Sequence, residues 1–230
     1  GNVFFACAVW PEATFGNLRF TNSTDTSLVL VKCDSDGNPL WASQVGDAGL
    51  QMAYEGLDLA VGPGGQAYVL GGFCGTGSLG GFQLTSRGWG DDFVVKFSGA
   101  GEVLWANQAG GSHWDTPRQL VVDAADQCSL LGDLFAPWAV SSTDGRWLTN
   151  ASTGYGIATF DPMGRARWTR TLFGYNIAPA SGGGLYVMGD DQGLWVTRLG
   201  EEGQTLWTVQ GSGSDDDYAY DWVVDRLGNI

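Results

Sequence analysis

The chain has no segment of the kind that places a protein in a membrane or around a zinc ion. No apolar run reaches the roughly 18 residues that a membrane-spanning helix needs. None of the cysteines forms a C-x-x-C pair, and the single histidine, His113, does not lie beside one. A structural zinc site is therefore disfavoured. A Ser-His-Asp triad is disfavoured too. The chain has one histidine, and the sequence identifies no serine as its partner.

Basic residues are also scarce. The chain has 11 Lys and Arg against 25 Asp and Glu, which gives a formal net charge of −14 and an isoelectric point near 4.1. Nucleic acids and anionic membrane surfaces require clustered Lys and Arg, so neither is an expected partner. The acidic balance favours an extracellular or cell-surface protein, with binding of a cation such as Ca²⁺ as an open possibility.

Glycine and tryptophan are abundant instead. The 230 residues include 37 Gly and 11 Trp, and 43% of the residues are hydrophobic. Glycine without collagen periodicity, alternating with aromatic and β-branched runs, is typical of many short strands joined by tight turns. The composition therefore predicts a folded, all-β protein.

One short pattern occurs four times. In each copy a Gly precedes a Trp by four residues, and an apolar, β-rich run ends nine residues before that Trp. The Gly/Trp pairs are Gly37/Trp41, Gly101/Trp105, Gly164/Trp168 and Gly203/Trp207, and the runs end at Lys32, Lys96, Thr159 and Arg198. Asp, Gly, Ser and Pro fill the intervening turns, as in Asp34–Gly37. The pattern predicts a hairpin in every copy, with the Gly in its turn.

Two more strands are expected in each copy. One follows the Trp, as in 57–61, 120–123 and 222–225, with a degenerate version at 178–180. The other comes after a further turn, as in 67–70, 128–131 and 185–188, and residues 3–6 fit the same position. An extra segment then contains Thr21, Thr85 and Thr149, which are 64 residues apart, and the last copy lacks it. Such a change in length predicts a surface loop or an outer edge hairpin.

Four antiparallel strands in a repeated unit predict a β-propeller with four-stranded blades. We expect a single domain over 1–230, with units at approximately 1–64, 65–126, 127–183 and 184–230. The two ends of the chain are expected to complete one shared blade. Either the four units close on themselves or they belong to a larger propeller, since residues 227–230 resemble the start of the chain.

The repeat resembles the SBBP family of bacterial β-propeller repeats. The resemblance is clearest over 65–126, where Gly72-Phe73, Leu84-Thr85-Ser86, Asp92–Lys96 and Leu104-Trp105-Ala106 follow the family's order. It implies a propeller fold and an exported or surface-anchored bacterial protein, and it brings no catalytic residues with it. A weaker similarity to quinone-cofactor dehydrogenases implies that the four repeated tryptophans dock neighbouring blades. The chain is short for such an enzyme and lacks its adjacent Cys-Cys pair.

Tryptophans outside the repeat are the candidate ligand-binding residues. They lie in or beside Gly- and Pro-rich loops, and they are Trp10, Trp89, Trp114, Trp138 and Trp147. An exposed aromatic ring can stack on a sugar. Filling the gaps between blade loops is the favoured interpretation of these residues, and sugar binding is the alternative.

The acidic run Asp215, Asp216 and Asp217 is the candidate metal site, although a solvated loop is the favoured interpretation. Asp34–Asn38 has oxygens at alternate positions, as Ca²⁺ loops do, but lacks the downstream Glu, so we expect an ordinary hairpin turn. The cysteines Cys7, Cys33, Cys74 and Cys128 do not recur at equivalent positions. Free, mostly buried thiols are favoured over two disulfides.

These features together predict a non-catalytic, exported propeller that acts as a structural or adhesive interaction module. Its expected partners are other protein subunits or surface polysaccharide. A carbohydrate-binding propeller is the alternative, and a polysaccharide-acting enzyme or a quinoprotein is less favoured because no catalytic constellation is visible.

Overall fold

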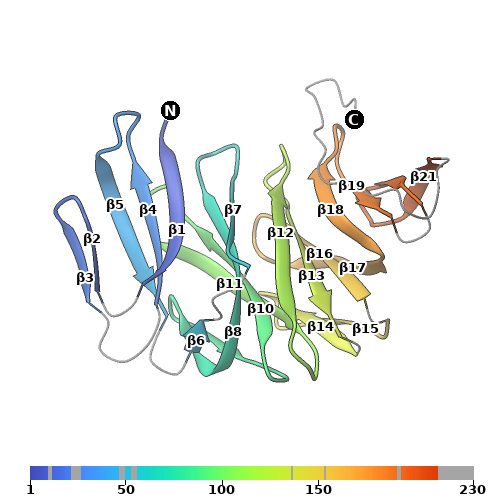
Figure 1. Ribbon diagram of the computed structural model, residues 1–230, viewed down its shortest axis with the longest axis horizontal. Coiled ribbons are helices and arrows are strands. Elements are labelled where there is room, and N and C mark those ends of the chain that lie inside the picture. Colours follow the sequence, from blue (N-terminus) through green and yellow to red (C-terminus); the bar gives the residue numbers. More distant parts are fainter. Residues whose placement is uncertain are drawn as a thin grey trace.

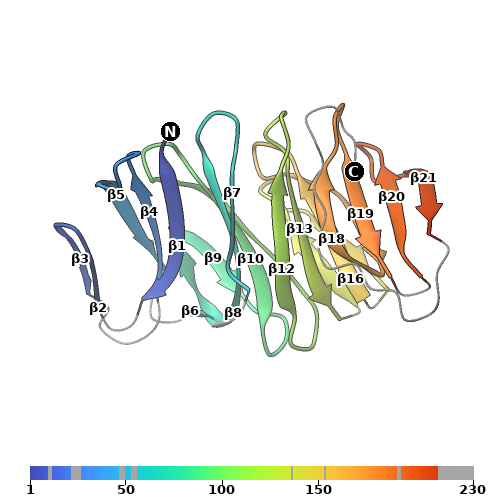
Figure 2. The same ribbon diagram turned by 45° about the horizontal axis from the view of Figure 1, so that its top comes forward.

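The chain folds into antiparallel β-sheets. The computed structural model describes residues 1–9, 12–21, 27–46, 50–52, 56–135, 137–152, 154–190 and 193–211. These residues form 21 strands and no helix, which confirms the expectation of an all-β protein. The sheets lie side by side in chain order, with the N-terminal sheet at one end and β21 at the other (Figures 1 and 2). In this part of the chain no helix has the length and apolarity that crossing a bilayer demands.

The first sheet has three strands in the order β1-β4-β5. They are β1 (Val3–Val9), β4 (Ser27–Cys33) and β5 (Pro39–Val45). A separate hairpin of β2 (Glu12–Phe15) and β3 (Leu18–Thr21) packs on its outer face (Figure 1). The further strand expected at 222–225 lies outside the described residues.

The second sheet contains β7-β8-β10-β11 and carries additional strands. Its four main strands are β7 (Asp58–Val61), β8 (Ala67–Leu79), β10 (Asp91–Phe97) and β11 (Val103–Gly110). Both β6 (Leu50–Met52) and β9 (Phe82–Thr85) also pair with β8. The hairpin of β14 (Trp138–Ser141) and β15 (Trp147–Asn150) extends the sheet beyond β11.

The third and fourth sheets each have four strands in chain order. The third contains β12 (Thr116–Val122), β13 (Cys128–Leu134), β16 (Gly154–Phe160) and β17 (Ala166–Leu172). The fourth contains β18 (Gly174–Pro179), β19 (Leu185–Gly189), β20 (Trp195–Leu199) and β21 (Thr205–Gln210). The segment regarded as degenerate, 178–180, thus takes part in a regular six-residue strand, β18, which begins four residues earlier.

The expected strands are present in the described residues, and the extra segments form hairpin strands at β2–β3, β8–β9 and β14–β15. Each of the second and third sheets takes its first strand, β7 or β12, from the end of the preceding repeat unit. The sheets are therefore offset from the sequence units.

The core lies between the sheets. In β4, Leu28 and Leu30 pack toward the second sheet, while Val29 and Val31 pack toward the β2–β3 hairpin. Further clusters join the second sheet to the third and the third to the fourth. A strand that is covered on both faces has no need of polar alternation, which explains the continuous apolar runs in the sequence.

Three of the four repeated tryptophans join neighbouring sheets. The indole Nε1 of Trp41 donates to the carbonyl of Gly99 at 3.1 Å, that of Trp105 to Pro162 at 3.2 Å, and that of Trp168 to Glu201 at 2.8 Å. Each acceptor belongs to the hairpin turn of the next sheet. The predicted docking role is thus confirmed at these three positions.

The repeated glycines explain how the rings come so close. Gly101, Gly164 and Gly203 have φ between +76° and +88°, which favours glycine. A Cβ on them would lie 2.7–2.8 Å from the ring of the preceding unit's Trp. Glycine is therefore required at these positions for two reasons: the turn needs a positive φ, and the indole that lies against the turn leaves no room for a Cβ.

The fourth Trp and the first Gly have no such partner among the described residues. Trp207 is 41% exposed, whereas Trp105 is 3% exposed. Nothing lies within 4 Å of the position that a Cβ on Gly37 would occupy. Trp207 belongs to the β20–β21 hairpin of the fourth described sheet, and Gly37 belongs to the β4–β5 hairpin of the first.

All four cysteines are free thiols, in agreement with the favoured expectation. Cys33 and Cys128 are buried, whereas Cys7 and Cys74 are half-buried. Burial raises the pKa of the Cys128 thiol, so this residue behaves as an apolar core side chain.

Candidate functional site

The candidate site lies where two loops of the second and third sheets meet. The backbone N–H of Trp89 donates to the carbonyl of His113 at 3.2 Å, and that of Asp115 donates to Gly90 at 3.0 Å. A Cβ on Gly88 would lie 2.5 Å from the backbone of residues 112–113, so only glycine permits this approach. Residues 86–91 and 111–115 therefore form one paired loop structure.

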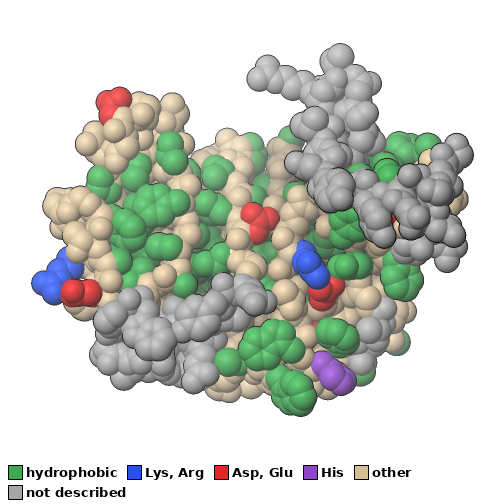
Figure 3. All heavy atoms as spheres, viewed as in Figure 1, with side chains coloured by type: hydrophobic (Ala, Val, Ile, Leu, Met, Phe, Trp, Pro, Cys, Tyr) green, Lys and Arg blue, Asp and Glu red, His purple; other side chains and the backbone are tan. Residues whose placement is uncertain are grey.

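Four aromatic side chains project from these loops and from the end of β13. Trp89 is 73% exposed, Trp114 is 46% exposed and Phe135 is 43% exposed. The ring of His113 lies between two of them, with its centroid 6.5 Å from Trp89 and 5.8 Å from Phe135. In Figure 3 hydrophobic side chains gather beside the single histidine at the lower edge of the molecule. We call Trp89, His113, Trp114 and Phe135 the aromatic loop face.

Buried carboxylates hold these loops in place. Asp115 accepts the backbone N–H of Gly111 at 2.7 Å and that of Phe135 at 2.8 Å. Asp91 accepts the N–H of Arg87 at 3.0 Å and the side-chain amide of Gln108 at 3.2 Å. The backbone under the aromatic loop face is thus held by hydrogen bonds, so the loops themselves do not need to be ordered when a ligand binds.

Burial changes the protonation of both carboxyls. Desolvation raises the pKa of Asp91 to about 7, with a further contribution from the nearby charge of Asp115. Desolvation also raises the pKa of Asp115, although its backbone hydrogen bonds oppose this shift. The two groups therefore titrate above the range of exposed aspartates.

Asp92 is different, because neither of its carboxyl oxygens has a hydrogen-bond partner among the described residues. It is fully buried at the start of β10, and a Cβ on Gly132 of the third sheet would lie 2.3 Å from its Oδ2. Desolvation, followed by the charges of Asp115, Asp91 and Asp133, raises its pKa well above the ordinary range. Leu28, Tyr155 and Leu194 occupy the equivalent repeat positions. Asp92 therefore places a carboxyl group in an otherwise apolar position, where burial favours its protonated form.

Two arginine side chains belong to segments next to the aromatic loop face in the chain. Arg118 forms an ion pair with Asp133 and lies over the ring of Tyr155, with Cζ 5.7 Å from the ring centroid. Arg87 lies over the exposed ring of Trp147 at 5.0 Å. Arg87 thus adds hydrogen-bond donors in the loop that carries Trp89, and Arg118 adds them on β12, the strand that follows the loop of Trp114.

The sequence-predicted tryptophans have different positions in the structure. Trp89 and Trp114 are brought together on the aromatic loop face, and Trp147 lies beside Arg87. Trp138 is 1% exposed, with its Nε1 donating to the carbonyl of Ser152 at 3.0 Å. Its assignment as a ligand-binding residue was wrong, because the ring fills the core between the second and third sheets. Trp10 lies outside the described residues.

Sequence reasoning missed Phe135 and the three buried aspartates. The available signal was the pair Asp91-Asp92 directly before an apolar run, where the other copies have no acidic residue. Phe135 had no signal, because it comes near His113 only through the fold.

The candidate metal residues Asp215, Asp216 and Asp217 lie outside the described residues. Within the described ranges, no group of three or more His, Cys, Asp or Glu side chains could hold a metal ion. In the turn at Asp34, its Oδ1 accepts the backbone N–H of Asp36 at 2.9 Å and of Asn38 at 2.8 Å. Asp123 and Asp161 cap their own turns in the same way, so the turn at Asp34 is an ordinary Asx turn.

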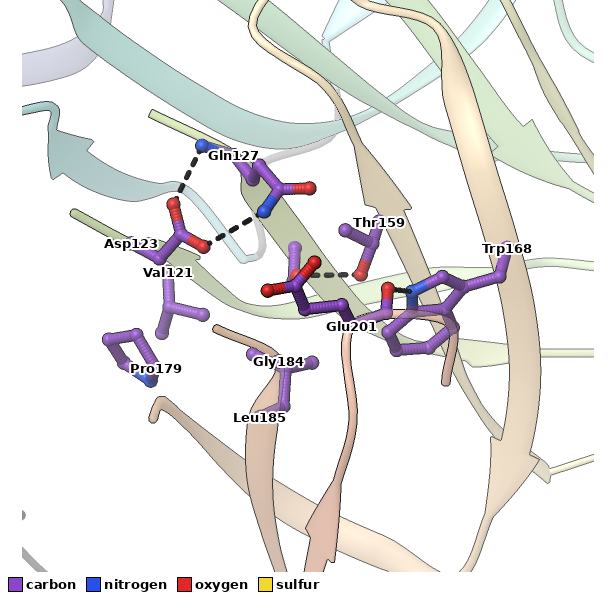
Figure 4. A pocket seen from close by; sticks show the side chains of 10 residues that line it. Val121, Asp123, Gln127, Thr159, Trp168, Pro179, Gly184, Leu185 and Glu201 are labelled. Atoms are coloured by element: carbon purple, nitrogen blue, oxygen red, sulfur yellow. Dashed lines mark hydrogen bonds between the residues drawn. The ribbon is translucent and has the colours of Figure 1, made fainter. Parts of the chain in front are cut away.

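Two concave regions lie elsewhere. The pocket in Figure 4, at the junction of the third and fourth sheets, contains the Trp168–Glu201 contact and has a volume of about 10 Å³, room for about one water. A groove of about 350 Å³ lies beside Phe173, Trp195 and Thr208, and none of the described residues that line it is titratable. The aromatic loop face is therefore the better candidate for recognition.

Comparison with known proteins yields structural similarity only. No protein-family model matches the chain, and no curated protein matches it. A protein of unknown function from Bacteroides caccae is 14% identical, with a TM-score of 0.40, over 84% of this chain and 64% of that one. The rhamnogalacturonan lyase YesW is 12% identical, with a TM-score of 0.42, over 93% of this chain and 48% of the lyase. A Bacillus licheniformis rhamnogalacturonan lyase is 11% identical, with a TM-score of 0.42, over 91% and 48%.

The chain thus spans less than two thirds of the first of these structures and about half of each lyase. At such low identities and scores the similarity transfers neither activity nor residue roles. The resemblance to SBBP repeats stays a prediction.

Proposed function

We propose that the protein is a non-catalytic, exported carbohydrate-binding module on a propeller-type scaffold. The scaffold is supported by two four-stranded antiparallel sheets, by the same order of four strands within the larger second sheet, by the order of the sheets along the chain, and by a Trp-to-turn contact at each junction. An exported, surface-associated role in adhesion rests on the acidic composition and on the resemblance to SBBP repeats.

The exposed rings of the aromatic loop face are the observation that supports carbohydrate as the ligand. Trp89, Trp114 and Phe135 present apolar surfaces that can stack on sugar rings. His113 and the neighbouring Arg118 supply polar groups that can bond hydroxyls. The net charge of −14 disfavours polyanions, so we expect a neutral polysaccharide.

A non-catalytic role is supported by the use of the carboxyls at this face. Asp91 and Asp115 accept hydrogen bonds from N–H groups of the loop backbone, and Asp92 is fully buried. Glycoside hydrolysis instead needs two carboxyl groups facing the bond that breaks. We assign these aspartates to positioning of the loops.

Titration with neutral oligosaccharides, followed by tryptophan fluorescence and calorimetry, tests this proposal. Trp89→Ala and Trp114→Ala should each weaken binding at least tenfold without changing the unfolding midpoint. Trp207→Ala, an exposed Trp outside the face, is the matched control and should bind normally. Absence of binding across a panel of neutral and acidic glycans, or equal weakening by all three variants, would contradict the assignment.

A further inference from the structure

The two ends of the sheet array carry complementary halves of the contact that joins every pair of neighbouring sheets. Each of the three internal contacts has a Trp on the leading sheet and a Gly-containing turn on the following sheet. In each, the indole N–H donates to the carbonyl two residues before the Gly. The unused halves are Trp207 at one end and the turn of Gly37 at the other.

The Trp207 end is an exposed apolar strand. Every residue of β21 is exposed, and Leu206, Trp207 and Val209 are 55%, 41% and 61% exposed. The indole N–H of Trp207 has no hydrogen bond among the described residues, whereas the other three repeated indoles have one each. Trp105 and Trp168, in the same repeat position, are buried by the sheet that follows them.

The Gly37 end has the matching acceptor. The turn is exposed and has open space around Gly37. The carbonyl of Ser35 lies two residues before Gly37. In the other units the carbonyl at this position, of Gly99, Pro162 or Glu201, accepts an indole N–H. In the described part of the chain nothing donates to the Ser35 carbonyl. The turn thus has room for an indole ring and an acceptor for its N–H.

The β2–β3 hairpin adds apolar surface to the Gly37 end. Phe15 and Phe20 precede Leu79 and Leu84 by 64 residues, the repeat spacing. Leu79 and Leu84 are buried in the cluster that lies between the first and second sheets. Phe15 and Phe20 lie on the outer face of the first sheet and are only half-buried. They therefore occupy the place where the repeat packs against a preceding sheet.

We propose that a second copy of this chain fills these surfaces, with Trp207 of one copy docking on the Gly37 turn of the next. The occupant is specified because each end matches the other and repeats a contact already made three times within the chain. Such a head-to-tail interface joins different surfaces of the two copies, so it closes a ring or extends as a filament. The proposal is independent of carbohydrate binding.

Sedimentation velocity over a wide concentration range tests the proposal on the full chain. The wild type should associate with rising concentration. Trp207→Ala and Gly37→Asn should each be monomeric, the second because Asn tolerates positive φ while its side chain fills the site of the ring. Trp89→Ala and Gly65→Asn are matched controls, because Gly65 has φ +78° in another open turn, and both should associate as the wild type does.

Mixing the two blocked variants provides the sharper test. Trp207→Ala retains a free Gly37 turn and Gly37→Asn retains a free Trp207, so an equimolar mixture should form a one-to-one pair that neither variant forms alone. A wild type that stays monomeric overturns the proposal. If fluorescence quenching then shows that Trp207 is shielded in this monomer, the chain has closed on itself, which also overturns it. Association that survives both substitutions, or a mixture that stays monomeric, overturns it as well. Monomeric Trp207→Ala should still bind sugar. Failure of the association proposal can therefore be distinguished from failure of the carbohydrate proposal.

Discussion

Trp105 and Trp207 occupy the same position of the same repeat, yet their environments differ. Trp105 is 3% exposed, bonds Pro162 and lies against Gly164 of the third sheet. Trp207 follows the same turn and the same strand pattern, but it is 41% exposed because no following sheet covers it among the described residues. The motif determines the hairpin, whereas the neighbouring sheet determines what the Trp contributes to stability. The following predictions test this difference, from the largest expected effect to the smallest.

Trp105→Ala should lower the free energy of unfolding by about 3–5 kcal/mol, because it empties a packed junction. Trp207→Ala should change it by no more than about 0.5 kcal/mol, as exposed substitutions usually do. Urea denaturation of both variants, in dilute protein, measures the difference. Equal losses at the two positions would show that Trp207 is packed in solution.

Two of the four positions nine residues before a repeated Trp are lysines, Lys32 and Lys96, and they extend the comparison. Lys96 is buried and bonds Asp126 at 2.7 Å and the carbonyl of Pro162 at 2.9 Å, the same carbonyl that Trp105 uses. Lys96→Met should cost about 3 kcal/mol, because it leaves Asp126 without its ion-pair partner. Lys32→Met, at the more exposed junction of the first and second sheets, should cost less than about 1 kcal/mol. Thermal denaturation would rank the two losses of stability. A larger loss for Lys32→Met than for Lys96→Met would contradict the expected order.

The turn glycines allow a similar comparison. Gly164→Ala should cost about 2 kcal/mol or more, since it adds a 2.7 Å clash with Trp105 to the strain of a positive φ. Gly37→Ala has the same strain without the clash and should cost about 1 kcal/mol. Chemical denaturation resolves the two costs, and equal values would mean that the clash relaxes.

The junction of the second and third sheets also contains a destabilising group. Asp92→Leu, which restores the residue type of Leu28 and Leu194, should raise the free energy of unfolding by about 1 kcal/mol at neutral pH. In the folded chain the raised pKa of Asp92 keeps its proton where the unfolded chain releases it near pH 4. The folded state therefore binds more protons, and stability falls as pH rises above about 4.

Titration of Asp91 also contributes to this decrease of stability with rising pH, up to its pKa of about 7 in the folded chain. Denaturation curves between pH 4 and 8 should show a decline in the wild type and a shallower one in Asp92→Leu. Identical slopes would mean that Asp92 is ionised or hydrated in the folded protein.

The sequence predicted the local structure well, because hairpins depend on nearby residues. The turns at Gly101 and Gly164 and the paired strands around them follow from the Gly-to-Trp spacing. The continuous apolar run Leu28–Val31 predicted a strand, but its burial by the second sheet on one face and by the β2–β3 hairpin on the other is known only from the structure. The closure of a propeller remains a prediction, since it depends on how the ends of the array meet.

The candidate site was less accessible from sequence. Trp89 and Trp114 were recognised as loop residues, but their meeting depends on the pairing of two loops that are 25 residues apart. Trp138 has the same loop context in sequence and is nevertheless in the core, because the β14–β15 hairpin pairs with β11. Exposure of a single Trp cannot be inferred without knowing which edge its hairpin joins.

A pair of double-mutant cycles tests the central claim most directly. In dilute protein, Trp105→Ala and Gly164→Ala should be coupled by about 1–2 kcal/mol, because removal of the ring also removes the clash. The equivalent cycle on Trp207 and Gly37 should give a coupling near zero. Equal coupling in both cycles would contradict the account, since it would mean that the two end residues already form within one chain the contact assigned here to the internal junctions.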